Sequence, residues 1–239
     1  MKKTDIFQKS LEELNITLTN KQMEQFHQYY EILIEWNKVM NLTGITEYDQ
    51  VVIKHFIDSL ALVKAVHLET NLKILDMGTG AGFPGIPLKI AFPQLNILLL
   101  DSLNKRIKFL DEVINRLGLN YITAIHGRAE ELIKKEGYRG GFDLCVSRAV
   151  ANLSTLSEYC IPYVKLNGMF IPYKSGNIKE ELEGAKEAVQ ILGGNILGVE
   201  EFSLPNTDID RSFVLIKKIK DTPKKYPRNG GKPLKEPLK

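Results

Sequence analysis

Cysteine, histidine and long hydrophobic runs are scarce in this chain of 239 residues. The two cysteines, Cys145 and Cys160, lack CxxC spacing, and the four histidines are scattered without the spacing of metal ligands. The longest purely aliphatic run covers residues 97–100, and charged residues interrupt the N-terminal segment. These absences disfavour a disulfide framework, a metal site and a membrane span. We therefore expect a cytoplasmic protein without a metal.

Composition and charge indicate one large globular domain with a basic end. Hydrophobic residues make up 44% of the chain and charged residues 26%, which suffices for a sizeable core. The net charge is +3, but residues 217–239 hold nine basic and two acidic residues, which leaves the rest mildly acidic. Such a basic end is typical of contact with nucleic acid, and equally of a solvated, disordered tail. Charge alone leaves both interpretations open.

The first region, residues 1–68, is expected to form helices packed on the core. Thr19 and Gln22 form a capping-box signature, and apolar residues recur at helical spacing from Met23 to Met40. A second apolar face runs through residues 51–66. Residues 37–46 hold two asparagines, two threonines and a glycine, which predicts a loop or a capped break between the two helices.

From residue 69 to residue 219, strands and helices alternate. We predict an amphipathic helix over 104–117 and strands over residues 73–77, 96–101, 121–126, 142–147, 168–173, 196–202 and 212–219. Repeated strand–helix units predict an α/β fold with a mostly parallel, helix-covered sheet. Only a loop separates the last two strands, so the final strand is expected to be antiparallel to its neighbours. Residues 220–239 then form a basic C-terminal tail.

The stretch ILDMGTGAGFPG, residues 74–85, places spaced glycines directly after the first strand. In a doubly wound sheet the ligand lies outside the carboxyl ends of the strands, and glycines let it approach the main chain. Gly78 and Gly80 are therefore predicted ligand contacts. Residues 80–85 also match the dinucleotide pattern GxGxxG, but Asp76 would repel a pyrophosphate and Pro84 removes a hydrogen-bond donor. A carboxylate here instead suits a ligand with a cationic amino or sulfonium group.

Asp101 ends the second predicted strand, at roughly the 20-residue separation at which an acid accepts hydrogen bonds from ribose hydroxyls. The same residue, together with Ser102, can cap the helix that begins near Asn104. Both roles are compatible, and the sequence leaves both open.

Six segments together resemble one known family. They are WNKVMNLT (36–43), HFIDS (55–59), DMGTGAGFPGIPL (76–88), LDSLNKR (100–106), SRA (147–149) and YPRNGG (226–231). Spread over nearly the whole chain, they resemble the RsmG (GidB) family. Glycine loops are shared by many class I S-adenosylmethionine methyltransferases, whereas the FPGIPL continuation and the SRA segment are far more selective.

The resemblance implies a Rossmann-like class I methyltransferase with a seven-stranded, mostly parallel sheet. It implies transfer of a methyl group from S-adenosylmethionine to N7 of a guanine in the 530 loop of 16S ribosomal RNA. At matching positions, the implied cofactor contacts are Gly78, Phe83, Ala129, Glu130 and Arg148. The implied partner is 16S rRNA or the small ribosomal subunit, and we expect a monomer.

Guanine N7 carries an in-plane lone pair and no proton at neutral pH, so we expect no general base. Holding nucleophile, methyl carbon and sulfur in line can contribute roughly 7–11 kcal/mol. An exocyclic-amine methyltransferase would show an Asn/Asp-Pro-Pro-aromatic loop after the fourth strand, and a cytosine-C5 enzyme a Pro-Cys nucleophile. The segment DLCVSRA, residues 143–149, contains neither. Cys145 is expected to pack in the core.

Arg148 is the predicted catalytic-site residue, with a role in positioning ligands. At the end of the fourth strand its guanidinium can pair with the cofactor carboxylate or an RNA phosphate, or hydrogen-bond the guanine O6 edge. An ion pair with Asp143 or another acid is the alternative.

Several other polar residues have two possible roles. His55 and Asp58 can face the cleft or attach the helical region to the sheet, and we favour attachment. Lys165, Lys174 and the basic tail are expected to contact RNA phosphates, with Tyr226 stacking on a base. Two other functional classes stay open: a nicotinamide- or flavin-dependent oxidoreductase, and a non-catalytic RNA-binding module.

Overall fold

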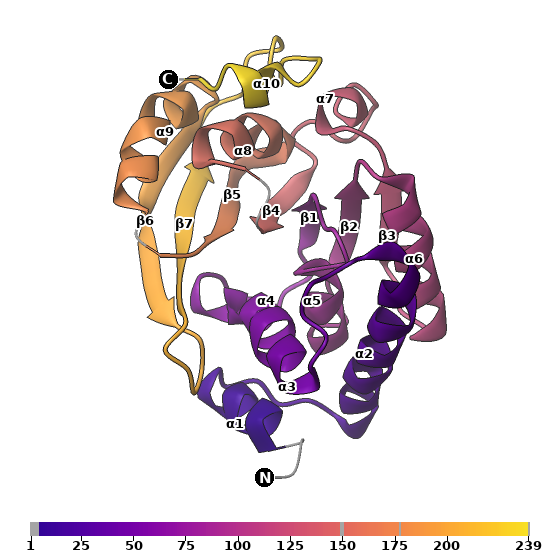
Figure 1. Cartoon of the computed structure of the whole chain (residues 1–239). Coiled ribbons are helices and arrows are strands. Elements are labelled where there is room, and N and C mark those ends of the chain that lie inside the picture. Colours follow the sequence, from indigo (N-terminus) through magenta and orange to yellow (C-terminus); the bar gives the residue numbers. More distant parts are fainter. Residues whose placement is uncertain (1–4, 149–150, 177, 239) are drawn as a thin grey trace.

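A seven-stranded sheet forms the centre of the molecule (Figure 1). The computed structural model describes residues 5–148, 151–176 and 178–238. The strands are β1 (Lys73–Met77), β2 (Asn96–Asp101), β3 (Ile122–His126), β4 (Phe142–Arg148), β5 (Val164–Lys174), β6 (Gly194–Ser203) and β7 (Asp210–Lys218), in the spatial order β3-β2-β1-β4-β5-β7-β6. Pairing is parallel from β3 to β5, whereas β7 is antiparallel to both β5 and β6. The predicted α/β fold and the antiparallel final strand are confirmed.

Helices cover both faces of the sheet. One layer holds α1 (Asp5–Glu13), α2 (Asn20–Met40), α3 (Tyr48–Val51), η1 (Val52–Ile57), α4 (Asp58–Leu60), η2 (Ala61–Lys64), α5 (Gly85–Ala91) and α6 (Asn104–Arg116). The other holds α7 (Ala129–Leu132), α8 (Leu153–Cys160), η3 (Ile161–Tyr163), α9 (Lys179–Ile191) and α10 (Lys232–Lys235). Successive strand residues alternate between the two cores, because side chains of a strand point to opposite faces. Ile74 and Leu144 belong to the first core, Leu75 and Cys145 to the second.

Helix α2 begins at the predicted capping box. The Thr19 hydroxyl accepts a hydrogen bond from the Gln22 amide, while the Gln22 side chain accepts one from the Thr19 amide at 2.8 Å. The helix continues to Met40 and ends at Asn41, which adopts a left-handed conformation. The loop therefore begins later than residue 37. Tyr29 of this helix is fully buried and donates its hydroxyl hydrogen bond to the Ala81 carbonyl, so α2 supports the glycine loop.

Residues 48–64 form four short helical pieces instead of one regular helix. The central piece, η1, is a π-helix of six residues that carries Lys54 and His55. π-helical turns are rare and are found frequently at functional sites. The apolar side chains still share one side, since Val52, Phe56 and Leu60 are all buried.

The C-terminal segment, residues 222–238, folds back on α8, as Figure 1 shows at the top of the view. Glu158 of α8 is fully buried and accepts hydrogen bonds from the main chain and the guanidinium of Arg228, the latter at 2.7 Å from Nη2. Tyr226 is only 6% exposed, so the expectation that its ring stacks on a base is wrong. Lys239, counted in the basic tail, lies outside the described residues.

Both cysteines are buried, as expected for Cys145. Among the described residues, no helix combines the length and apolar character needed to cross a membrane. No group of three or more potential metal ligands occurs in the described part of the chain.

Candidate functional site

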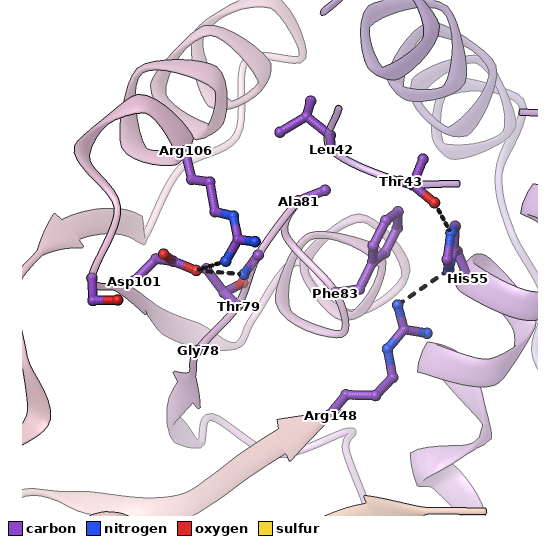
Figure 2. A pocket seen from close by; sticks show the side chains of 12 residues that line it. Leu42, Thr43, His55, Gly78, Thr79, Ala81, Phe83, Asp101, Arg106 and Arg148 are labelled. Atoms are coloured by element: carbon purple, nitrogen blue, oxygen red, sulfur yellow. Dashed lines mark hydrogen bonds and ion pairs between the residues drawn. The ribbon is translucent and has the colours of Figure 1, made fainter. Parts of the chain in front are cut away.

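A cavity of about 400 Å³ lies beyond the carboxyl ends of β1, β2 and β4. From β1 the strand order runs to β2 and β3 on one side and to β4 and β5 on the other, so this is the point where a doubly wound sheet binds its ligand. The lining residues are Leu42, Thr43, His55, Gly78, Thr79, Gly80, Ala81, Phe83, Asp101, Ser102, Arg106 and Arg148. Figure 2 shows Asp101 and Arg106 on one side of Phe83, with His55 and Arg148 on the other. Five predicted cofactor contacts, Gly78, Gly80, Phe83, Asp101 and Arg148, thus meet in one cavity.

Hydrogen bonds attach the glycine loop to Asp76. The Asp76 Oδ2 atom accepts hydrogen bonds from the Thr79 hydroxyl at 2.6 Å and from the Gly85 amide at 2.8 Å. Gly85 has no room for a side chain, because a Cβ atom there would lie 2.3 Å from the Leu99 side chain. Gly80 differs: its φ is +63°, and a Cβ atom would have no atom within 4 Å. Its missing side chain therefore leaves open space beside the cavity.

Asp76 is fully buried and does not line the cavity. Burial raises its pKa to about 6, although the hydrogen bonds from Thr79 and Gly85 act in the opposite direction. Its Oδ1 atom has no hydrogen-bond partner among the described residues. The carboxylate thus stabilises the conformation of the loop through hydrogen bonds and is not accessible as a counter-charge for a cationic ligand.

Asp101 connects the loop to the start of α6. Its Oδ2 atom accepts hydrogen bonds from the Gly80 amide at 2.9 Å and from Arg106 Nη1 at 3.1 Å. Its Oδ1 atom accepts one from the Leu103 amide at 2.9 Å. The N-cap position of α6 is Leu103, without a side-chain cap, so the capping role considered for Asp101 and Ser102 is not realised. Contact of Asp101 with a ribose stays a prediction.

Arg148 forms the opposite wall. Its Nη1 atom donates to Asp58 Oδ2 at 2.9 Å and to the Lys54 carbonyl at 3.1 Å, and its Nη2 atom lies 3.2 Å from His55 Nδ1. The guanidinium lies 5.0 Å from the centre of the Phe83 ring, on which the His55 ring also stacks at 4.5 Å. The acid paired with Arg148 is thus Asp58. Asp143 instead accepts from Lys165. Ala149, the last residue of the SRA segment, lies outside the described residues.

Both ring nitrogens of His55 have polar partners. Nδ1 lies 3.2 Å from Arg148 Nη2 and 3.1 Å from the Lys54 carbonyl, and Nε2 lies 2.9 Å from the Thr43 hydroxyl. Burial, and next the charge of Arg148, lower the pKa of His55 to about 4. His55 is therefore neutral at physiological pH.

Ala129 and Glu130 follow β3 at the start of α7, at the same edge of the sheet. Both are buried, and neither lines the cavity. The Ala129 carbonyl accepts a hydrogen bond from the Tyr163 hydroxyl at 2.6 Å. Their contact with an adenine stays a prediction.

One wall of the cavity was missed by reasoning from the sequence. Leu42 and Thr43 reach it from the loop after α2, because Asn37 bonds both the amide and the carbonyl of Thr43 at 2.9 and 3.0 Å. The WNKVMNLT segment is the signal in the sequence for this wall. Arg106, on α6, was also missed, and its place in the LDSLNKR segment was the available signal.

A second cavity of about 640 Å³ adjoins the first and shares His55 and Arg148 with it. Lys174, expected to contact RNA, lines this second cavity and pairs with Glu181 at 2.6 Å. Lys165 lies elsewhere, since its partner Asp143 stands near the start of β4, at the opposite edge of the sheet. The contact of each lysine with RNA phosphates stays a prediction.

The first cavity suits an elongated ligand with hydroxyl groups at one end and a carboxylate at the other. Asp101 offers acceptors, the glycine loop offers bare main chain, and the Arg148 guanidinium offers donors beyond those used by Asp58, Lys54 and His55. An adenosyl amino acid has this chemistry.

Comparison with known proteins places the chain in a family. The family model described as rRNA small subunit methyltransferase G, GidB, matches residues 22–212. Ribosomal RNA small subunit methyltransferase G of Lachnoclostridium phytofermentans is 58% identical over 100% of this chain and 98% of its own length. The protein of the same name from Lactococcus lactis subsp. lactis is 47% identical over 98% of this chain and 99% of its own.

Solved structures agree on the fold. A mutant of MtNAS in complex with S-adenosylmethionine aligns with a TM-score of 0.55 at 17% identity, over 84% of this chain and 72% of its own. A SAM-dependent methyltransferase from Aquifex aeolicus aligns with a TM-score of 0.52 at 16% identity, over 70% and 93%. With these likenesses in fold and in sequence, the chain belongs to the rRNA small subunit methyltransferase G (GidB) family.

Proposed function

We propose that this protein transfers the methyl group of S-adenosylmethionine to N7 of a guanine in the 530 loop of 16S ribosomal RNA, within the small ribosomal subunit. The observation that carries the proposal is the cavity at the strand-order switch point, lined by Gly80, Asp101 and Arg148. Membership of the family supports the RNA substrate, and the N7 position comes from the resemblance of the sequence motifs. We further propose a cytoplasmic monomer.

In this proposal S-adenosylmethionine, when bound, supplies an electrophilic methyl group on a sulfonium. Asp101 accepts from the ribose hydroxyls, Arg148 binds the carboxylate, and Gly78, Phe83, Ala129 and Glu130 complete the cofactor contacts. The residues orient the reactants and move no proton, since N7 attacks with its own lone pair. This fits His55, whose lowered pKa makes it a weak base.

The first test fills the open space at Gly80. We expect Gly80→Val to lose binding of S-adenosylmethionine in calorimetry and transfer of labelled methyl to unmodified small subunits. The matched control is Gly118→Val: Gly118 has φ +61°, and its Cβ position also has no atom within 4 Å, but it lies after α6 and outside the cavity. Equal binding of S-adenosylmethionine by the two variants would argue that Gly80 does not line the site for this cofactor.

The second test separates the functional classes. Mapping the labelled nucleotide should find 7-methylguanine in the 530 loop, and calorimetry with NADH should show no binding. A methyl on another atom or loop contradicts the substrate proposed here. Binding of NADH in place of S-adenosylmethionine favours an oxidoreductase. RNA binding without any transfer favours a non-catalytic module.

A further inference from the structure

Three charged side chains from distant parts of the sequence form a buried chain beside the cavity. Arg148 comes from the end of β4, Asp58 from the start of α4, and Arg211 from β7. Each oxygen of Asp58 holds one guanidinium: Oδ2 accepts from Arg148 Nη1 at 2.9 Å, and Oδ1 accepts from Arg211 Nε at 2.8 Å. The Asp58 side chain is 4% exposed, against 14% for Arg148 and 20% for Arg211.

The two guanidinium groups leave Asp58 little freedom to rotate. A carboxylate with a charged donor on each oxygen has a fixed plane, and loss of either donor leaves a buried acceptor unpaired. Asp58 also follows the π-helix directly, and the Lys54 carbonyl of that helix accepts a second hydrogen bond from Arg148. The direction of the Arg148 guanidinium is thus set by Asp58 and Lys54 on the helical side, and Arg211 sets the direction of Asp58.

The position of Arg148 matters because this residue lies in the wall common to both cavities. Its guanidinium lies over Phe83 and against His55, which leaves the donors not used by protein groups for a ligand in the first cavity. Buried ion pairs contribute little net stability compared with apolar packing, so the larger effect expected here is on orientation.

We propose that Asp58 and Arg211 are positioning residues for methyl transfer, which act by holding Arg148 at the wall of the cofactor cavity. Neither side chain lines that cavity itself. The inference rests on the proposed role of Arg148 as a contact of S-adenosylmethionine.

A double-mutant cycle with full-length protein tests the coupling. We expect Asp58→Asn and Arg148→Gln each to raise the KM for S-adenosylmethionine about tenfold, and the double variant to be no worse than Arg148→Gln alone, because residues that act as one unit are not additive. The KM for small subunits should stay within about twofold of the wild type, because the inference assigns Arg148 to the cofactor and not to the RNA. Losses that multiply in the double variant overturn the inference.

Arg211 supplies the second arm of the test. Arg211→Met should raise the KM for S-adenosylmethionine. Arg211→Lys keeps a cationic hydrogen-bond donor for Asp58 and should reverse most of that increase. The control is Arg116→Gln, which breaks an exposed ion pair with Glu35 far from this chain of charges and should leave the KM unchanged. If Asp58→Asn does not fold, the comparison of Lys with Met at position 211 decides, and equal KM values in these two variants reject the inference.

The outcomes separate this inference from the proposed function. Absence of methyl transfer in the wild type rejects the function. An unchanged donor KM in Arg148→Gln, with transfer intact, rejects the role of Arg148 and with it the inference. A raised KM in Arg148→Gln combined with an unchanged KM in Asp58→Asn rejects the inference alone.

Discussion

Two titratable residues at the site, the buried Asp76 and the partly buried His55, have pKa values displaced in opposite directions. Burial raises the pKa of Asp76 to about 6 and lowers that of His55 to about 4. In each case burial favours the uncharged form. The wall residue His55 thus stays neutral near pH 7, whereas Asp76 is mostly ionised and depends on its hydrogen bonds with Thr79 and Gly85.

The sign of the His55 effect on stability follows from linkage. The folded pKa lies below the unfolded value of 6.5, so between about pH 6.5 and pH 4 the unfolded state binds more protons. The contribution of neutral His55 is complete above pH 6.5 and is lost as the pH falls toward 4. Asp76 acts in the opposite sense, because its raised pKa makes the folded state bind more protons from about pH 4 to pH 6.

We therefore expect the free energy of unfolding of the wild type, relative to His55→Gln, to shrink by up to about 2 kcal/mol between pH 7 and pH 5. Asp76 is present in both proteins and its contribution cancels in the difference. Urea unfolding at the two pH values measures this quantity. A difference that does not change with pH would mean that His55 titrates near its ordinary value in the folded protein.

At the scale of elements, α2 connects the helical layer to the glycine loop. The side-chain amide of Gln22 donates hydrogen bonds to the carbonyls of Ile90 and Ala91 at 2.8 and 3.0 Å. One residue thus takes part in the capping box of α2 and also binds the end of α5. The capping box itself is largely exposed, whereas these two bonds to α5 are partly buried.

This arrangement predicts that alanine substitutions at the two capping-box residues lower the free energy of unfolding by different amounts. Thr19→Ala should lower the free energy of unfolding by about 1 kcal/mol, the usual value of a lost N-cap. Gln22→Ala should cost about 1–2 kcal/mol more, because two carbonyls of α5 lose their donor. Denaturant midpoints at constant slope measure both changes, and Thr19→Ala should leave the affinity for S-adenosylmethionine unchanged. Equal losses of unfolding free energy in the two variants would show that the hydrogen bonds from Gln22 to α5 contribute nothing to stability.

The strands were predictable because buried apolar runs bounded by turn residues specify them. Bounds were least accurate at β5, which begins at Val164 and not at residue 168, because a register shift and Asn167 at φ +65° interrupt its first part. The π-helix was not predictable, since its apolar residues keep a spacing that a regular helix also allows. The contacts of Asp58 with Arg148 and Arg211 join residues 90 and more positions apart, which no local pattern encodes.

At the scale of the whole molecule, the C-terminal segment contributes both packing and charge. Arg228 neutralises the buried Glu158, and the Thr155 hydroxyl donates to the Pro233 carbonyl at 2.9 Å. The remaining basic residues face solvent: Lys224, Lys225, Lys232 and Lys235 are all exposed. The segment is thus an ordered part of the fold that carries a basic surface.

Substitutions can separate these two roles. Replacing the four exposed lysines by glutamine should leave the melting temperature unchanged, weaken binding to ribosomal RNA and reduce the salt slope of log K by up to about 3. Arg228→Met should instead cost about 3–5 kcal/mol of stability, because it leaves a buried carboxylate without its partner. Filter binding across salt concentrations and thermal unfolding measure the two effects. The four lysine-to-arginine changes are the matched control, and an unchanged slope with glutamine would remove these lysines from the RNA surface.

The place of β7 in the sheet has a consequence for how the protein is made. This strand follows β6 in the sequence but inserts between β5 and β6, and it carries Arg211 to Asp58. A nascent chain that still lacks residues 210–218 leaves the hydrogen-bonding edge of β5 uncovered and Asp58 without one of its two partners. The partners of Asp58 are thus complete only once residues 210–218 have been synthesised and have paired with β5.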